Sequence, residues 1–110
     1  MAKNEFGLQL DRNGYSGSLL FGHGPCWCFL CGEHRHTERH EIFGGANRQK
    51  SKELGLWVYL CEECHRTGEQ AVHRDAEVSR SLKQKAQTIA QEFYRWTVEI
   101  FRERFGKSYL

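Results

Sequence analysis

Two Cys-x-x-Cys pairs, each called a knuckle below, constrain this chain more than any other feature. The first pair is Cys28 and Cys31, and the second is Cys61 and Cys64. A two-residue spacer lets the backbone turn back so that both sulfurs face one ion, and zinc prefers a tetrahedral thiolate shell. Unrelated thiols or a redox-active pair are the alternatives, but two pairs in so short a chain favour zinc. We therefore predict one structural Zn²⁺ at these cysteines, contributing on the order of 10 kcal/mol to folding.

The remaining cysteine bears on the cellular compartment. Five cysteines are present, and an odd number fits a disulfide scaffold poorly. Cys26 has no partner at ligand spacing, so we expect it to be a free thiol. The first residues include Lys3 and Glu5 and lack the apolar segment of a secretory signal. No apolar run approaches the roughly 20 residues that span a bilayer. We therefore expect a cytoplasmic protein that has no membrane partner.

The size and charge of the chain limit its classes of partner. The 110 residues are 39% hydrophobic and 27% charged, which is typical of one small folded domain and not of a disordered tail. The formal net charge is +2, and zinc bound by four thiolates would add about two negative charges. Attraction to nucleic acid must then come from local basic patches, because the whole molecule is close to neutral.

Three regions follow one another along the chain and together predict one domain. Residues 1–25 are rich in glycine and predict an N-terminal arm, in which Asn13-Gly14 is the turn of a weak hairpin. Residues 26–74 hold both knuckles and most of the histidines, and they predict the core. Residues 75–110 predict C-terminal helices that pack on this core.

Local patterns predict the main elements within these regions. Leu56–Leu60 is a dense run of apolar, β-branched and aromatic residues, which is typical of a strand. Residues 46–53 predict a short helix that the following glycine closes. After Asp75, apolar residues recur every three or four positions, which predicts a long helix capped by that carboxylate. Thr97 caps a second, shorter helix that stops at Gly106.

Several strings of residues are similar to those of one known family. They are RHEIFGGANR at 39–48, GLWVYLC at 55–61 and FGKSYL at 105–110. With a first knuckle, a histidine at a strand start and a second knuckle followed by histidine, they resemble small zinc-stapled HNH endonucleases of bacteriophages and prophages. The resemblance covers roughly residues 26–110. It implies an α+β fold, with a zinc-stapled ββα-metal (HNH-like) core and a C-terminal helical extension.

The resemblance also implies a site that hydrolyses DNA phosphodiesters with a second divalent ion, Mg²⁺, Mn²⁺ or Zn²⁺. In that family a strand presents a metal ligand beside a general base, and the next helix supplies a histidine ligand, which His65 matches. Aligned on Ile42, His40 takes the ligand position and Glu41 the base position. Shifted by one residue, His40 becomes the base and Arg39, which cannot ligate a cation, takes the ligand position. The first register is preferred because it keeps Ile42 in phase with the strand.

The other histidines have simpler expected roles. His65 follows the second knuckle directly, so its side chain can point away from the zinc into a second site. His73, in the loop beyond it, could complete the metal shell, and an ordinary loop histidine is the alternative. We expect His34 and His36 to be solvated, and His23 has no assigned role.

Basic residues bracket the expected cleft and predict contacts with DNA phosphates. The predicted contact residues are Arg39, Asn47, Arg48, Lys50 and Lys52. A solvated polar loop is the alternative, because Glu33, Glu38 and Glu53 dilute the positive charge.

Three functions remain open at this point. The first is a metal-dependent HNH-type endonuclease of a phage or prophage, acting in the cytoplasm of the bacterial host. The second is a catalytically degenerate zinc-binding module that binds DNA or a phage or host protein. The third is a structural zinc domain in a larger phage assembly. The catalytically degenerate module stays open because Glu41, with a reference pKa near ~4.3, is a weak general base unless burial raises that pKa.

Overall fold

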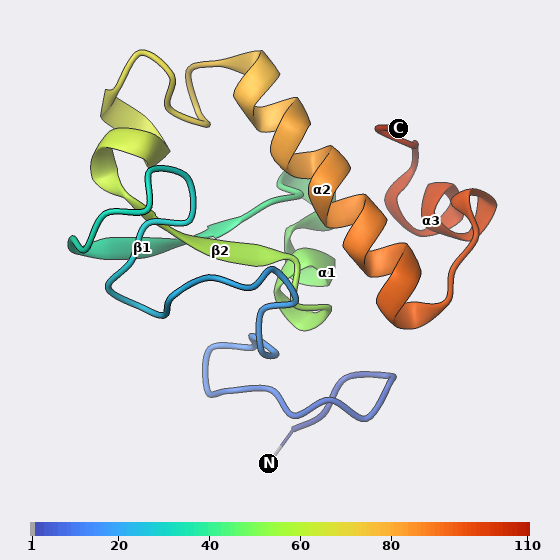
Figure 1. Ribbon diagram of the computed structural model, residues 1–110. Helices are drawn as coiled ribbons and strands as arrows, with labels where there is room; N and C mark the ends of the chain where they lie inside the picture. Colours follow the sequence, from blue (N-terminus) through green and yellow to red (C-terminus); the bar gives the residue numbers. More distant parts are fainter. Residues whose placement is uncertain (1) are drawn as a thin grey trace.

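The computed structural model describes residues 2–110 and shows a small α+β protein. In chain order the elements are β1 (Thr37–Glu41), the 3₁₀ helix η1 (Gly45–Asn47), α1 (Arg48–Glu53), β2 (Trp57–Cys61), the single-turn π-helix η2 (Glu63–Thr67), α2 (Ala76–Tyr94) and α3 (Val98–Phe105). In Figure 1 the long helix α2 runs diagonally past the two-stranded sheet, and α3 lies beyond it beside the C-terminus.

The hairpin of β1 and β2 is the centre of the structure. The strands pair antiparallel, from Thr37 opposite Cys61 to Glu41 opposite Trp57. Successive side chains of a strand point to opposite faces, so residues 38 and 40 of β1 share one face and residues 39 and 41 share the other. The predicted strand at 56–60 is therefore present, displaced by one residue.

The three predicted helices are present, and the predicted residues cap the two longer ones, α2 and α3. The Asp75 side chain accepts from the backbone N–H groups of Glu77 and Val78 at the start of α2. Thr97 caps α3 in the same way, and α3 ends at Gly106, whose φ of 90° only glycine adopts readily. The short helix predicted at 46–53 is divided between η1 and α1.

The C-terminal helices pack on the hairpin through one continuous apolar cluster. Leu56, just before β2, and Leu60 of β2 are completely buried in it, and Phe101 of α3 is equally buried. Phe43, just after β1, places its ring 5.6 Å from that of Phe101 and 4.8 Å from that of Phe105. This packing fixes the end of β1, where the candidate site begins.

The N-terminal arm is held by hydrogen bonds to α1, to Gly55 and to Trp57 of β2. The expected turn is present, since Gly14 N–H donates to the Asp11 carbonyl and Asp11 N–H donates to the Tyr15 carbonyl. Paired strands are absent from the arm within residues 2–110, apart from one isolated bridge, because its many glycines favour turns. The arm docks instead, with the Trp57 indole donating to the Ser16 carbonyl.

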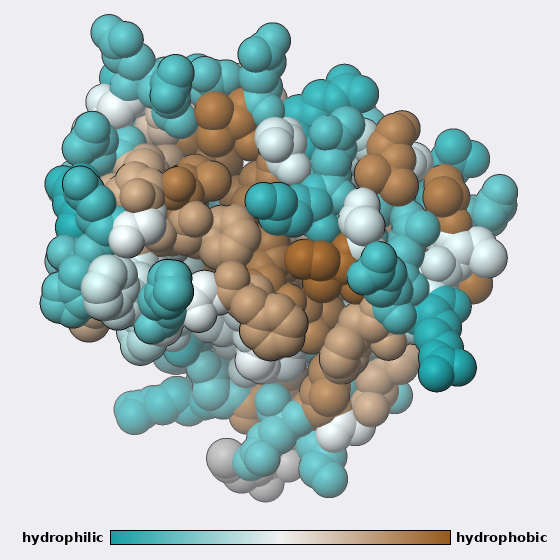
Figure 2. Space-filling model, viewed as in Figure 1, coloured by the Kyte–Doolittle hydropathy of each residue, from teal (hydrophilic) through white to brown (hydrophobic). Residues whose placement is uncertain are grey.

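One face of the molecule carries exposed apolar side chains. Figure 2 shows brown, apolar surface running across the middle of the view, with polar groups around it. Phe21 is 93% exposed and Phe93, on α2, is 52% exposed. No helix within residues 2–110 is both long enough and apolar enough to cross a membrane.

Candidate metal centres and cleft

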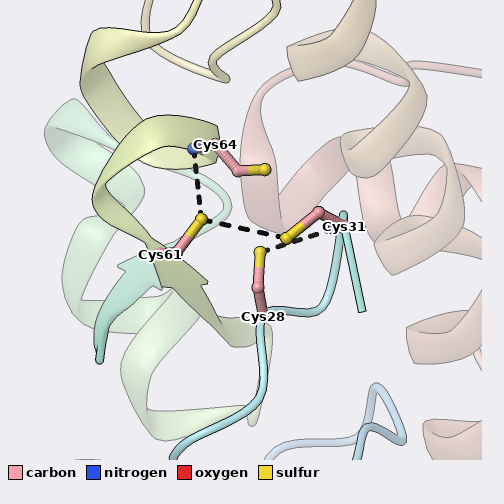
Figure 3. A group of neighbouring side chains, drawn as sticks. All are labelled: Cys28, Cys31, Cys61 and Cys64. Atoms are coloured by element: carbon pink, nitrogen blue, oxygen red, sulfur yellow. Dashed lines mark hydrogen bonds between the residues drawn. The ribbon is translucent and has the colours of Figure 1, made fainter. Parts of the chain in front are cut away.

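The four knuckle cysteines converge on one point. Their sulfur atoms all lie within 4.8 Å of one another, and those of Cys31 and Cys61 are 3.9 Å apart. Figure 3 shows two of them coming from the loop before β1, one from the end of β2 and one from η2. A tetrahedral ion with bonds of about 2.3 Å sets its sulfurs about 3.8 Å apart. The cluster could therefore hold a metal ion such as zinc.

The thiols of this cluster affect one another's ionisation. Burial alone would raise the pKa of the Cys28 thiol, but backbone N–H groups, among them those of Cys31 and Cys61, lower it to about 7. Burial and the neighbouring thiols raise the pKa of Cys31 and of Cys64. Four thiolates cannot stand side by side without a cation, so this donor set fits a bound metal ion. Cys26 is exposed and lies outside the cluster.

Three histidines form a second group of possible metal ligands. One ring nitrogen from each of His40, His65 and His73 lies within 4.8 Å of the other two. Nε2 of His65 and Nε2 of His73 are 2.9 Å apart, and the His40 ring lies 5.0 Å from the His65 ring. They come from β1, η2 and the loop before α2. The structure thus brings together the three histidines that the sequence assigned to a second ion.

The surroundings of two of these histidines, His40 and His73, favour their neutral form. His40 and His65 are buried, while His73 is exposed. Burial, aided by the two neighbouring imidazoles, lowers the pKa of His40 to about 4. Burial and His65 also lower the pKa of His73. A neutral imidazole has a free lone pair and can ligate a cation.

The helical turn η2 links the two groups. It is a π-helix of one turn, a rare conformation that often marks a functional site. Cys64 contributes to the cysteine group, and the next residue, His65, contributes to the histidine group. The Cys64 and His65 carbonyls accept from the N–H groups of Val72 and His73, which fixes the loop that carries the third imidazole.

The histidines open into a cleft of about 370 Å³. Its lining residues are Tyr15, Arg39, His40, Glu41, Gly44, Gly45, Arg48, His65, Arg66 and His73. The cleft reaches around the end of β1, so residues from both faces of that strand line it. Its polar lining, with several guanidinium groups beside neutral imidazoles, suits an anionic ligand.

Glu41, the residue predicted as general base, lies at the edge of this cleft. Its carboxylate accepts from the Tyr15 hydroxyl at 2.8 Å and from Arg48 Nε at 2.6 Å. The Glu41 side chain is only 10% exposed. Both of its oxygens are therefore engaged before any substrate enters.

The predicted phosphate-contacting residues fall into two sets. Arg39 and Arg48 line the cleft, and Lys52 lies beside it with its ammonium 4.8 Å from the Tyr15 ring centre. Asn47 donates to the Phe105 carbonyl, and Lys50 donates to the Arg104 carbonyl. These last two contacts hold α3 and lie outside the cleft lining.

Sequence reasoning missed three residues of the site, which are Glu38, Arg66 and Tyr15. Glu38, interpreted above only as diluting positive charge, accepts from His65 Nδ1 at 2.6 Å and from Arg66 Nε at 3.0 Å. Its alternation with His40 along a strand could have indicated their shared face. No local pattern pointed to Tyr15, which the arm brings from a distant part of the sequence. His34 and His36 are exposed, as expected.

Comparisons with known protein families, with curated protein sequences and with solved structures find no match to this chain. Fold and site alone therefore define its class. It is a small α+β protein with a cysteine group that could hold a metal ion such as zinc, and with a histidine group positioned to bind a metal ion. The resemblance to HNH endonucleases stays a prediction from sequence motifs.

Proposed function

We propose that this protein is a metal-dependent, HNH-type endonuclease that hydrolyses DNA phosphodiesters and is encoded by a phage or prophage. A structural zinc ion would occupy the cysteine group, and a second divalent ion the histidine group. The observation that carries the proposal is the convergence of His40, His65 and His73 in an arginine-lined cleft. An ion there would polarise the scissile phosphate and stabilise the leaving oxygen.

The donor set bears on which second ion is bound. Mg²⁺ prefers oxygen ligands and keeps several waters, whereas neutral imidazoles suit transition metals. Three nitrogen donors therefore favour Zn²⁺ over Mg²⁺ and Mn²⁺ at His40, His65 and His73.

The surrounding side chains would bind the phosphate and accept a proton. Arg48 and Arg66 are 68% and 61% exposed, so each can reach a phosphate oxygen. When Arg48 turns to the phosphate it leaves Glu41, and that carboxylate becomes free to accept a proton from the attacking water. This sequence of contacts keeps the preferred register, with His40 as ligand and Glu41 as base.

Plasmid nicking tests the proposal. Zinc-loaded protein supplied with Mn²⁺, Zn²⁺ or Mg²⁺ should convert supercoiled plasmid to open circles. His40→Ala and His65→Ala should each lower the rate by roughly 100-fold or more, because each removes a ligand. The matched control is His36→Ala, which removes an exposed histidine outside the cleft. If fully zinc-loaded wild-type protein nicks no plasmid with any of these divalent metals, the proposed endonuclease activity is disproved.

One observation favours a second candidate, the non-catalytic zinc module that binds DNA. Glu41 is already bound to Tyr15 and Arg48, as in a structural ion pair. Such a module would retain DNA on a column at low salt, release it as salt rises, and show no nicking. His40→Ala would leave that retention unchanged, which separates the two functions.

A further inference from the structure

Glu38 links β1, which carries His40, to η2, which carries His65. It lies on the same face of β1 as His40. Its Oε1 atom accepts from His65 Nδ1 at 2.6 Å and from Arg66 Nε at 3.0 Å. The Glu38 side chain is 39% exposed, whereas that of His65 is 4% exposed. The carboxylate therefore reaches from the protein surface to a buried ring.

The bond to Glu38 decides which nitrogen of His65 can ligate a cation. A neutral imidazole has one N–H and one lone pair, and a carboxylate can only accept. The proton must then be on Nδ1, which leaves the lone pair on Nε2. That Nε2 atom lies 2.9 Å from His73 Nε2, among the three candidate ligands.

The contacts of Arg66 agree with this arrangement. Its Nε atom lies 3.4 Å from His65 Nδ1 but only 3.0 Å from the Glu38 oxygen. A protonated Nδ1 cannot accept, so Arg66 donates to the carboxylate. One carboxylate thus fixes the ring of His65 and also directs a guanidinium that lines the cleft.

We propose that Glu38 is a positioning residue: it keeps His65 in the tautomer with Nε2 free and places Arg66 at the cleft mouth. The proposal rests on the proposed function, since it treats His65 as a ligand of the second ion. Carboxylates that accept from a ligating histidine orient the ring and increase its basicity, and their loss commonly weakens metal binding 10- to 100-fold, as an order of magnitude. An exposed Glu–Arg pair alone would have no such effect on a metal.

Calorimetry gives the first test. Zn²⁺ is titrated into protein that already carries one zinc per chain. Glu38→Ala should bind this second zinc roughly 10- to 100-fold more weakly than wild type. Glu38→Gln should recover part of the loss, because its amide oxygen still accepts from Nδ1. The control is Glu33→Ala, an exposed glutamate whose side chain pairs with Arg35 alone among residues 2–110. Equal affinities of Glu38→Ala and wild type would overturn the proposal.

The tautomer of His65 gives a second test that needs no second ion. Long-range ¹⁵N–¹H correlation spectra of zinc-loaded wild type should show the proton on Nδ1. Glu38→Ala should show a tautomer mixture, with a backbone spectrum like that of wild type. If His65 of the wild-type protein instead carries its proton on Nε2, the proposed role of Glu38 is overturned. Wild type that binds no second Zn²⁺, Mn²⁺ or Mg²⁺, yet shows the Nδ1 proton, would disprove the proposed nuclease site while supporting the positioning role.

Discussion

The cysteine and histidine groups are neighbours that share η2, yet they are built differently. The cysteine group has four donors from two tight knuckles, with no position left for a reactant. The histidine group has three donors, from β1, η2 and a loop, and it opens into a cleft. A full four-ligand shell is typical of structural zinc, whereas three protein ligands leave a coordination position for chemistry.

This difference predicts that the histidine group depends on the cysteine group, whereas the cysteine group forms without the histidines. Cys64 lies in the same turn as His65, directly before it, so the histidine group needs the cysteine group to be closed. The cysteines need no histidine, because each knuckle is formed by its own short stretch of backbone. Variants of the two groups should therefore fail in different ways.

Cys61→Ser should have the largest effect of any single substitution. Cys61 is 1% exposed and ends β2, and structural zinc contributes on the order of 10 kcal/mol, comparable to the whole stability of a domain. We expect unfolded protein at 25 °C by circular dichroism and no stoichiometric zinc by elemental analysis. Cys26→Ser, which removes an exposed thiol outside the group, should keep both zinc and fold. A wild-type melting temperature for Cys61→Ser would refute the structural zinc.

Arg48→Ala should leave the fold intact and lower the affinity of the cleft for DNA. Its side chain is 68% exposed at the cleft edge, so it can contact one phosphate. We expect weaker DNA binding and a slope of log K against log salt that is smaller by about one unit. Fluorescence anisotropy at several salt concentrations measures both quantities.

Lys50→Ala is the matched control for this prediction. Lys50 lies on the same helix α1, but its ammonium donates to the Arg104 carbonyl and does not line the cleft. Its salt slope should match that of wild type. Equal reductions in slope for Lys50→Ala and Arg48→Ala would show that the DNA-binding surface extends past the cleft.

Features set by a few consecutive residues could be predicted from the sequence. The cysteine group follows from knuckle spacing, and the ends of α2 and α3 follow from Asp75, Thr97 and Gly106, because capping is a local interaction. The convergence of His40 and His65 was expected only from the resemblance to a family. Neither periodicity nor composition specifies the distance between a strand and a later turn.

Features that depend on long-range contacts could not be predicted. Tyr15 reaches Glu41 because the arm docks on β2 through the Trp57 indole, an interaction between segments far apart in the chain. Glu38 was interpreted only as diluting the positive charge of the basic patch, because nothing nearby in the sequence reveals that His65 lies beside it. In both cases the sequence did not reveal the partner of a carboxylate, that of Glu41 in the first case and that of Glu38 in the second. The role of a carboxylate is set by the partner that folding brings to it.

Tyr15→Phe should have the smallest effect. It tests how much the hydrogen bond from the N-terminal arm to Glu41 contributes to stability. It removes the hydroxyl that donates to Glu41 at 2.8 Å and keeps the ring that Arg39 covers at 4.3 Å. Loss of one hydrogen bond should lower the free energy of unfolding by about 0.5–1.5 kcal/mol. Urea unfolding of zinc-loaded protein measures this change, and zinc content should stay constant.

Tyr109→Phe is the control for that loss, because its hydroxyl makes no hydrogen bond within residues 2–110 while its ring packs against Phe43. It should unfold at the urea concentration of wild type. Were Tyr15→Phe equally stable, the Tyr15 hydroxyl would contribute no stability, and Glu41 would be held by Arg48 alone. A carboxylate held by a single exposed guanidinium is released more easily when phosphate competes, so that result would favour Glu41 as the base of the cleft.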